Sequence, residues 1–279
     1  MRTSNDSFQK WIARKRNRIK RRNKNWLCIM GGDTGSGKSY TAARICELID
    51  PTFLPAIIKN GIKSRVALGE THELLNILDA GKLKRGNMVI FDEAGIAISS
   101  RDWFKEINKM IMYILQTFRH MNIGVIFTVP DVSFVDKQAR SLFHTFIHCL
   151  KIDYKKEKVI CKPFELQNNP YQADVYRKYP RYKGWKNTRF FIKKPAKAFI
   201  DQYEPLKVEL SKKLRARAIT IQDRVEIKEK TRRTDKEIMK EIKERNVERD
   251  AYTLQFEFGI GKDRAYRIIN NWEKFSPLI

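Results

Sequence analysis

The chain has 279 residues, of which 42% are hydrophobic, and it carries a formal net charge of +25 at pH 7. This apolar content is enough for the core of one large or two smaller domains and excludes a disordered chain. The charge predicts a polyanionic partner, nucleic acid first and an anionic membrane surface second. The four cysteines form no CxxC pair, and no apolar leader or apolar run of about 18 residues occurs, so we expect a reduced, cytoplasmic protein without a membrane span.

The first 24 residues predict a basic arm. Lysine and arginine occur throughout this segment against a single acid, Asp6, and we expect residues 1–24 to be helical when bound to a phosphate backbone. The candidate DNA contacts in the arm are Arg14, Lys15, Arg16 and Arg18. A disordered tail, a localisation signal and a membrane-surface helix are the alternatives, although the apolar side chains are sparse for a membrane helix.

A glycine-rich stretch stands between the apolar run 26–30 and a helical pattern over 40–49. A strand, a glycine turn and a helix start are the setting of a phosphate-binding loop, because backbone N–H groups and the helix dipole together attract an anion. The expected nucleotide contacts are Gly32, Asp33, Thr34, Gly35, Ser36, Gly37, Lys38, Ser39 and Tyr40. Lys38 would reach the β- and γ-phosphates of ATP, and the Ser39 hydroxyl would bind Mg²⁺. A surface turn is the alternative.

Residues 88–93 form a second motif, four apolar residues followed by two acids. This pattern predicts a buried parallel strand whose carboxyl end meets the ligand. Asp92 would hold Mg²⁺, and Glu93 would orient and deprotonate the attacking water. Two neighbouring carboxylates that only cap a turn are the alternative, which the upstream phosphate loop disfavours.

The remaining elements predict an α/β fold. We expect helices over 71–78 and 101–118, a short strand or loop over 53–58, a strand over 123–128, a hairpin or two edge strands over 143–152 and 158–164, and a strand at 190–192. Alternating strands and helices argue for a three-layer sandwich on a mostly parallel sheet. Thr128 would either sense the γ-phosphate or only satisfy the end of its strand.

Basic and aromatic residues are interleaved over 168–189, which suits either a nucleic-acid groove or an ordinary polar insertion with an aromatic rim. A charged helical connector is expected over 206–230, and a separate small unit over 231–279. In that unit, Thr234 and Glu237 have the spacing of a capping box, and two later helices flank a glycine turn at 259–261.

Two helices joined by a glycine turn predict a small all-α helix-turn-helix domain at the C-terminus. Its expected core is Leu254, Phe258, Ile260, Ala265, Ile268 and Trp272. The predicted DNA contacts are Lys262, Arg264, Tyr266, Arg267 and Asn270. A three-helix oligomerisation module is the alternative, and Gln255 stands where a small residue is usual in helix-turn-helix domains.

The loop at 32–39 and the Asp92-Glu93 pair together resemble the P-loop ATPases that carry a catalytic glutamate beside the Mg²⁺ aspartate. With the later motifs at 118–120, 122–130 and 135–140, residues 25–205 resemble the FtsK-HerA superfamily of DNA-pumping ATPases. That superfamily includes viral packaging motors and the related Zot-type assembly ATPases of filamentous phages. It often has glutamine where Thr128 stands.

The resemblance implies a P-loop NTPase domain over 25–205 that works as a homo-hexameric ring around duplex DNA. An arginine from the neighbouring subunit would complete the site, and Arg119 and Arg140 are the candidates, with Arg101 a poorer third. The implied function is Mg²⁺-dependent ATP hydrolysis that moves DNA for a virus or mobile element, in the host cytoplasm, with a virion or portal protein as a further partner. An ATP-switched DNA-binding regulator or partition protein and a Zot-type virion-assembly ATPase are the alternatives.

Overall fold

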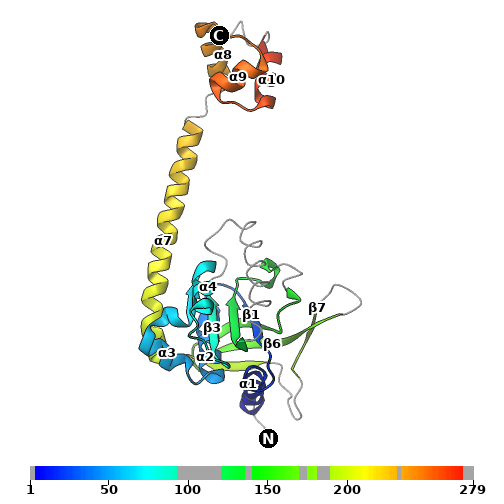
Figure 1. Ribbon diagram of the computed structural model, residues 1–279, viewed down its shortest axis with the longest axis vertical. Coiled ribbons are helices and arrows are strands. Elements are labelled where there is room, and N and C mark those ends of the chain that lie inside the picture. Colours follow the sequence, from blue (N-terminus) through cyan, green and yellow to red (C-terminus); the bar gives the residue numbers. More distant parts are fainter. Residues whose placement is uncertain are drawn as a thin grey trace. The chain divides into compact units, whose positions relative to one another are not determined.

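The computed structural model of the chain describes residues 4–92, 121–135, 140–169, 175–180, 189–230 and 234–272. The chain divides into two compact units, residues 1–214 and 215–279 (Figure 1). Each unit has a buried core of its own.

The first unit is built on a sheet that has eight strands in the described part of the chain, in the order β2-β3-β4-β1-β5-β6-β7, with β8 beside β6. The strands are β1 (Trp26–Gly31), β2 (Val66–Leu68), β3 (Met88–Asp92), β4 (Gly124–Thr128), β5 (Thr145–Asp153), β6 (Lys158–Asn168), β7 (Val175–Lys178) and β8 (Phe190–Lys193). The strands from β2 to β5 in this order are parallel, and β6, β7 and β8 add antiparallel pairs. The predicted α/β fold on a mainly parallel sheet, as in P-loop NTPases, is confirmed.

β1 lies in the middle of the parallel strands, and all six of its residues are buried. Met30 of β1 is in register with Thr128 of β4, and Phe91 of β3 is in register with Phe127 of β4. The carboxyl ends of these three strands therefore reach the same edge of the sheet. Open α/β sheets bind their ligands at this edge, and the glycine loop and Asp92 both lie there.

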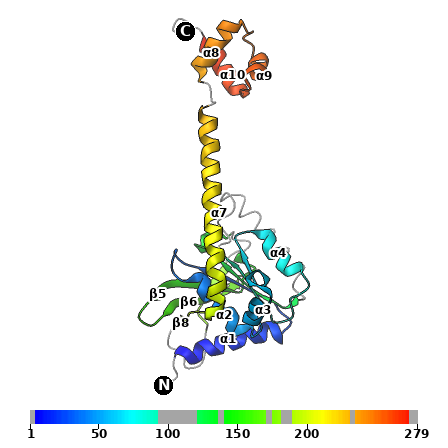
Figure 2. The same ribbon diagram turned by 90° about the vertical axis from the view of Figure 1, so that its left-hand side faces the viewer.

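Helices cover both faces of the sheet (Figures 1 and 2). The helices of the first unit are α1 (Ser4–Lys20), α2 (Lys38–Ile49), α3 (Phe53–Asn60), α4 (Thr71–Asp79) and the start of α7 (Lys197–Lys230), with short 3-10 turns at Ile62–Ser64 and Val132–Phe134. Apolar residues of α1, α2, α3 and α7 share one core with the sheet, and those of α4 belong to the core on the opposite face. The four cysteines are buried free thiols.

Helix α1 differs from the expectation of a separate basic arm, because its apolar side chains are part of the core. Trp11 and Ile19 are fully buried, and Phe8 and Ile12 are nearly so. The Trp11 ring packs edge-on against Trp26 of β1, with 5.7 Å between ring centroids. Apolar residues three and four positions apart lie on one helix face. In this segment the many basic residues between them make that apolar face hard to recognise in the sequence.

Residues 53–60 form helix α3, so the expectation of a short strand or loop at 53–58 is wrong. Pro55 lies in the first turn of this helix, where a proline removes no intrahelical hydrogen bond. The predicted helix at 71–78, the strands at 88–92 and 123–128, and the antiparallel hairpin of β5 with β6 are confirmed. The predicted helix over 101–118 lies outside the described residues.

The second unit contains α8 (Asp235–Arg245), α9 (Ala251–Phe258) and α10 (Lys262–Asn270). The predicted capping box is present, since the Thr234 hydroxyl accepts from the Glu237 N–H and the Glu237 carboxylate accepts from the Thr234 N–H. Five of the expected core residues are buried, and Trp272 is partly buried against them. In the described ranges, no helix has the length and apolarity needed to cross a membrane.

Candidate nucleotide-binding site

The loop between β1 and α2 has the backbone of a phosphate-binding turn. Gly35 and Gly37 have φ angles of 79° and 85°, which side-chain-bearing residues rarely adopt. A Cβ on Gly32 would lie 2.3 Å from the Cys149 carbonyl oxygen, and one on Gly37 would lie 2.7 Å from Val159 Cγ2. The close approach of β5 and β6 therefore requires glycine at these two positions.

Two polar groups in the loop are held as a phosphate ligand would need them. The Lys38 ammonium donates to the carbonyl oxygens of Gly32 (2.6 Å) and Asp33 (2.8 Å), and partial burial lowers the pKa of this lysine. The Ser36 hydroxyl is buried and has no hydrogen-bond partner in the described part of the chain. A phosphate oxygen would satisfy Ser36 and would give Lys38 an anionic partner in place of two carbonyl groups.

Asp92 joins the two nucleotide motifs. It is fully buried at the end of β3, and its Oδ1 atom accepts from Ser39 Oγ at 3.0 Å and from Thr128 Oγ1 at 2.5 Å. The Tyr203 hydroxyl of α7 donates to its Oδ2 atom. Ser39 and Asp92, 53 residues apart in the chain, thus have the adjacency that a shared Mg²⁺ requires.

A cleft of about 430 Å³ opens beside these groups. Its lining combines the loop, the end of β4 and the α7 side chains Tyr203, Glu204 and Lys207. The Tyr40 hydroxyl donates to Glu204 at 2.6 Å, and burial, together with this carboxylate, raises the pKa of Tyr40 to about 12. The cleft has the volume typical of a small-molecule site.

Sequence reasoning missed the contribution of α7 to this site. The predicted boundary between 205 and 206 places Lys207 in a connector, and the sequence predicts no role for Tyr203. The available signal was the spacing of Phe199 and Tyr203, four residues apart on one helix face, which buries both rings against the core.

The residues fit ATP with Mg²⁺. Lys38, Ser36 and the loop N–H groups would hold the phosphates, and Ser39 and Asp92 would hold the metal ion, which would neutralise charge on the phosphate oxygens. Two oxygen ligands from the protein are usual for Mg²⁺, which keeps several waters. Within the described ranges, no group of three His, Cys, Asp or Glu side chains forms a second metal site.

The other predicted catalytic residues are only partly described. Thr128 lies at the site, where it is buried and bonded to Asp92. Arg140 is described but does not line the cleft, and its buried Nε atom has no hydrogen-bond partner within the described ranges. Glu93 and Arg119 lie outside the described residues.

The predicted DNA contacts lie on two helices. On α10, Lys262, Tyr266 and Asn270 are exposed, whereas Arg264 and Arg267 donate to the carboxylate of Asp235 at 2.8 Å and 3.0 Å. On the first helix of the chain, the predicted contacts are less available than expected.

On α1, Arg14 is the one exposed residue among the predicted DNA contacts, which are all described. Lys15 is 7% exposed and pairs with Glu165, Arg16 donates to the carbonyl groups of Leu48 and Ile49, and Arg18 donates to that of Asn25. Lys15 and Arg16 therefore stabilise the fold, because the helix packs on the domain and does not project from it.

Comparisons with known proteins match part of this chain. The family model described as Zonular occludens toxin (Zot) matches residues 57–154. "Gene 1 protein" of Enterobacteria phage I2-2 is 29% identical over 94 residues, which are 32% of this chain and 26% of that protein. The chain thus aligns with only about a quarter of the length of this relative.

Two solved structures are similar at low identity. The N-terminal domain of zonular occludens toxin from Neisseria meningitidis is 18% identical, with 64% of this chain and 99% of that chain covered and a TM-score of 0.37. The genome packaging NTPase B204 of Sulfolobus turreted icosahedral virus 2, in complex with ATP-gammaS, is 12% identical, with 58% and 100% covered and a TM-score of 0.26. By sequence, residues 57–154 of the chain match the Zot family.

Proposed function

We propose that this protein is a Mg²⁺-dependent ATPase of a virus or mobile element that acts on DNA. The observation that carries the proposal is the hydrogen bond of 3.0 Å between Ser39 and Asp92 beneath the glycine loop. It joins the two motifs that bind Mg²⁺·ATP. The match to the Zot family and the phage relative support the viral setting.

In the proposed reaction, Glu93 activates the attacking water, and Lys38 and Mg²⁺ neutralise charge that develops on the phosphates. Thr128 is a candidate for sensing the γ-phosphate through its contact with Asp92. We further propose a hexameric ring of the FtsK-HerA type, in which Arg119 or Arg140 of a neighbouring subunit completes the site.

We also propose a division of the chain into domains. Residues 1–214 form the ATPase domain, the rest of α7 is a connector, and residues 231–279 form a helix-turn-helix domain that contacts duplex DNA through α10. Exposed Lys262, Tyr266 and Asn270 support this role. Arg264 and Arg267 would exchange Asp235 for DNA phosphates.

The substitution Glu93→Gln tests the catalytic assignment. The variant should bind ATP with unchanged affinity and should lose hydrolysis, because the amide cannot accept the proton of water. Glu157→Gln, an exposed position in the turn between β5 and β6, is the matched control and should hydrolyse ATP normally. Turnover by Glu93→Gln near the control rate would refute Glu93 as the base.

The dependence of turnover on DNA separates a motor from a switch. A translocase should hydrolyse ATP faster as duplex length increases, since each ring then takes more steps before it dissociates. A DNA-binding protein whose assembly is set by ATP should show turnover that is insensitive to length, and this result would exclude the motor.

A Zot-type virion-assembly ATPase is the second candidate, and the family match over residues 57–154 favours it. Such a protein would work with a membrane partner. Cosedimentation with liposomes but not with DNA would support this candidate over the DNA motor.

A further inference from the structure

A second cleft, of about 720 Å³, lies beside α1 and is lined by residues other than those of the nucleotide site. One wall is α1 with the turn that follows it, and the other is formed by β6, the end of β7 and the two residues after it. Six of its lining residues are basic: Arg14, Lys15, Arg18, Arg22, Lys24 and Lys178.

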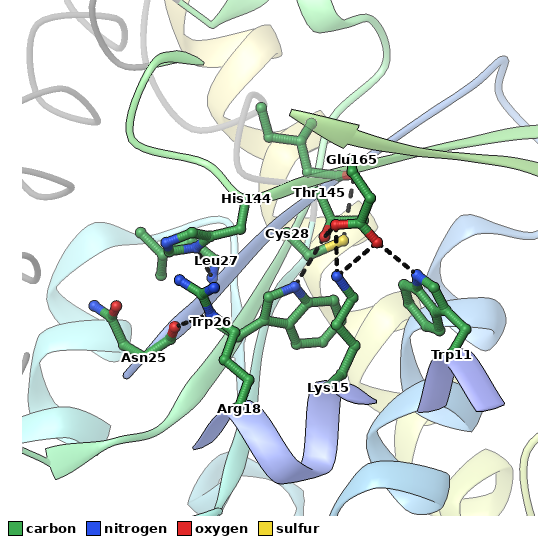
Figure 3. A network of polar contacts seen from close by, with 11 residues as sticks. Trp11, Lys15, Arg18, Asn25, Trp26, Leu27, Cys28, His144, Thr145 and Glu165 are labelled. Carbon is green, nitrogen blue, oxygen red and sulfur yellow. Dashed lines mark hydrogen bonds and ion pairs between the residues drawn. The ribbon is translucent and has the colours of Figure 1, made fainter. Parts of the chain in front are cut away.

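Among the described lining residues, Glu165 is the only carboxylate, and it is already engaged. Lys15 Nζ lies 2.7 Å and 2.6 Å from its two oxygens, and Trp11 Nε1 and Thr145 Oγ1 donate to it at 3.0 Å and 3.3 Å (Figure 3). Glu165 therefore balances the buried Lys15, and the described lining residues include six basic side chains against this one carboxylate.

The floor of the cleft is also fixed in place. Arg18 donates to the Asn25 carbonyl at 2.8 Å, and the Lys15 ammonium lies 5.2 Å and 5.7 Å from the ring centroids of Trp11 and Trp26. With Lys15 paired to Glu165, Arg18 is the cation held ready for an anion, and a preorganised cation loses little side-chain entropy on binding.

An aromatic side chain completes the opposite wall. Tyr179, the aromatic residue of the described lining, is 41% exposed and packs against Phe164, with 4.9 Å between ring centroids, whereas Tyr176 of β7 is 48% exposed but lies outside the lining. Exposed rings beside cations are typical of surfaces that bind a nucleic-acid strand, with phosphates on the cations and bases on the rings. The described lining has no Leu, Ile, Val, Phe or Met, the side chains that a membrane surface would require.

We propose that the cleft between α1 and β7 binds the phosphodiester backbone of a nucleic-acid strand. The inference deepens the proposed function, since the partner is of the same class, and it rests on that function for the biological role. It does not depend on ATP hydrolysis, so the two can fail separately.

The test uses one lysine from each wall in the full chain. Lys24→Ala with Lys178→Ala should weaken binding of a fluorescent single-stranded oligonucleotide about tenfold at low salt, and should reduce the slope of log affinity against log salt by about 1.4. The matched control, Lys155→Ala with Lys156→Ala, removes two exposed lysines from the turn between β5 and β6 and should retain the wild-type slope. Thermal unfolding identifies any variant that fails to fold.

Three outcomes would overturn the proposal: equal losses in the two double variants, no loss in either, or a loss that appears with phosphatidylserine vesicles and not with oligonucleotides. A duplex of the same length, run in parallel, shows whether the strand is bound single or paired. ATP turnover of Glu93→Gln reports on the proposed function independently, so failure of one inference is distinguishable from failure of the other.

Discussion

Two carboxylates of the first unit are held in opposite ways. Asp92 is fully buried, and in the described part of the chain it accepts hydrogen bonds from three hydroxyl groups, with no ammonium or guanidinium group in an ion pair with it. Glu165, beside α1, has its own ammonium partner in Lys15. The first is a carboxylate supported by neutral groups, and the second is part of an ion pair.

This difference separates a ligand site from a structural contact. Hydroxyl groups orient a carboxylate without neutralising it, so a cation that binds beside Asp92 gains the full charge of the oxygen atoms. A carboxylate already paired with a lysine has little to offer a metal ion, and removal of either partner leaves a charge in a desolvated position. Substitutions at Asp92 should therefore change activity, and substitutions in the Glu165 network should change stability.

The largest effect is expected for Asp92→Asn. The amide still accepts hydrogen bonds but has no charge for Mg²⁺, so ATP turnover should fall by roughly 10²–10³-fold, while the free energy of unfolding changes by less than about 1 kcal/mol. Steady-state hydrolysis measures the loss of ATP turnover, and urea unfolding measures the change in the free energy of unfolding. Asp79→Asn, at the exposed end of α4, is the control. A large loss of stability in Asp92→Asn would mean that Asp92 holds the fold together and is not a metal ligand.

The Glu165 region should control the acid stability of the protein through His144. Burial, and then the neighbouring Arg18 and Lys15, lower the pKa of His144 to about 3, and its Nδ1 atom accepts from the Leu27 N–H. Below pH 6.5 the His144 imidazole takes up a proton in the unfolded chain but stays neutral in the folded protein. As the pH is lowered from 6.5 to 3, the free energy of unfolding should therefore decrease, by at most about 1.4 kcal/mol per pH unit from this group.

His144→Gln isolates that contribution, since glutamine keeps an acceptor but does not titrate. Denaturant unfolding at a series of pH values should show the variant losing less stability than the wild type as the pH falls through this window. If the free energy of unfolding depends on pH equally in the two proteins, His144 takes up its proton at the same pH in the folded and unfolded states, which contradicts the prediction.

A smaller loss is expected when the ion pair is broken. Lys15→Met keeps most of the side-chain volume but leaves Glu165 without its cation, and should cost about 2 kcal/mol. The value is below that of a fully buried pair because the Glu165 side chain is 35% exposed. Urea unfolding of Lys15→Met, Glu165→Gln and the double variant forms a cycle, and strictly additive losses would show that the two groups do not interact.

The two regions also differ in how far the sequence predicted them. The residues of the glycine loop are consecutive, and the buried strand ending in Asp92 is a local pattern, so both motifs and the parallel sheet could be expected. Lys15 and Glu165 are 150 residues apart, and nothing local indicates that two oppositely charged residues will meet. The same holds for Tyr203 and Asp92, which are 111 residues apart.

The errors have a common physical cause. Charge over residues 1–24 suggested an exposed arm, but the packing of Trp11 and Ile19 determined where the helix lies. The expected strand or loop over 53–58 is a helix, because the first turn of a helix tolerates Pro55 and Phe53 and Ile57 are buried. In both segments, the burial of a few apolar side chains outweighed the more conspicuous residues around them.

The smallest effect, and the sharpest test of the comparison, is expected for Tyr203→Phe. If the hydroxyl groups around Asp92 only orient a metal ligand, loss of one should weaken Mg²⁺ binding about tenfold, as for other groups that support metal ligands. ATP binding measured in EDTA should be unchanged, because we expect the glycine loop and Lys38, and not the Tyr203 hydroxyl, to hold the phosphates. Tyr154→Phe, at an 80% exposed position, is the control. An equal loss of ATP affinity with and without Mg²⁺ would mean that Tyr203 shapes the cleft itself, and that Asp92 does not need its hydroxyl to be a metal ligand.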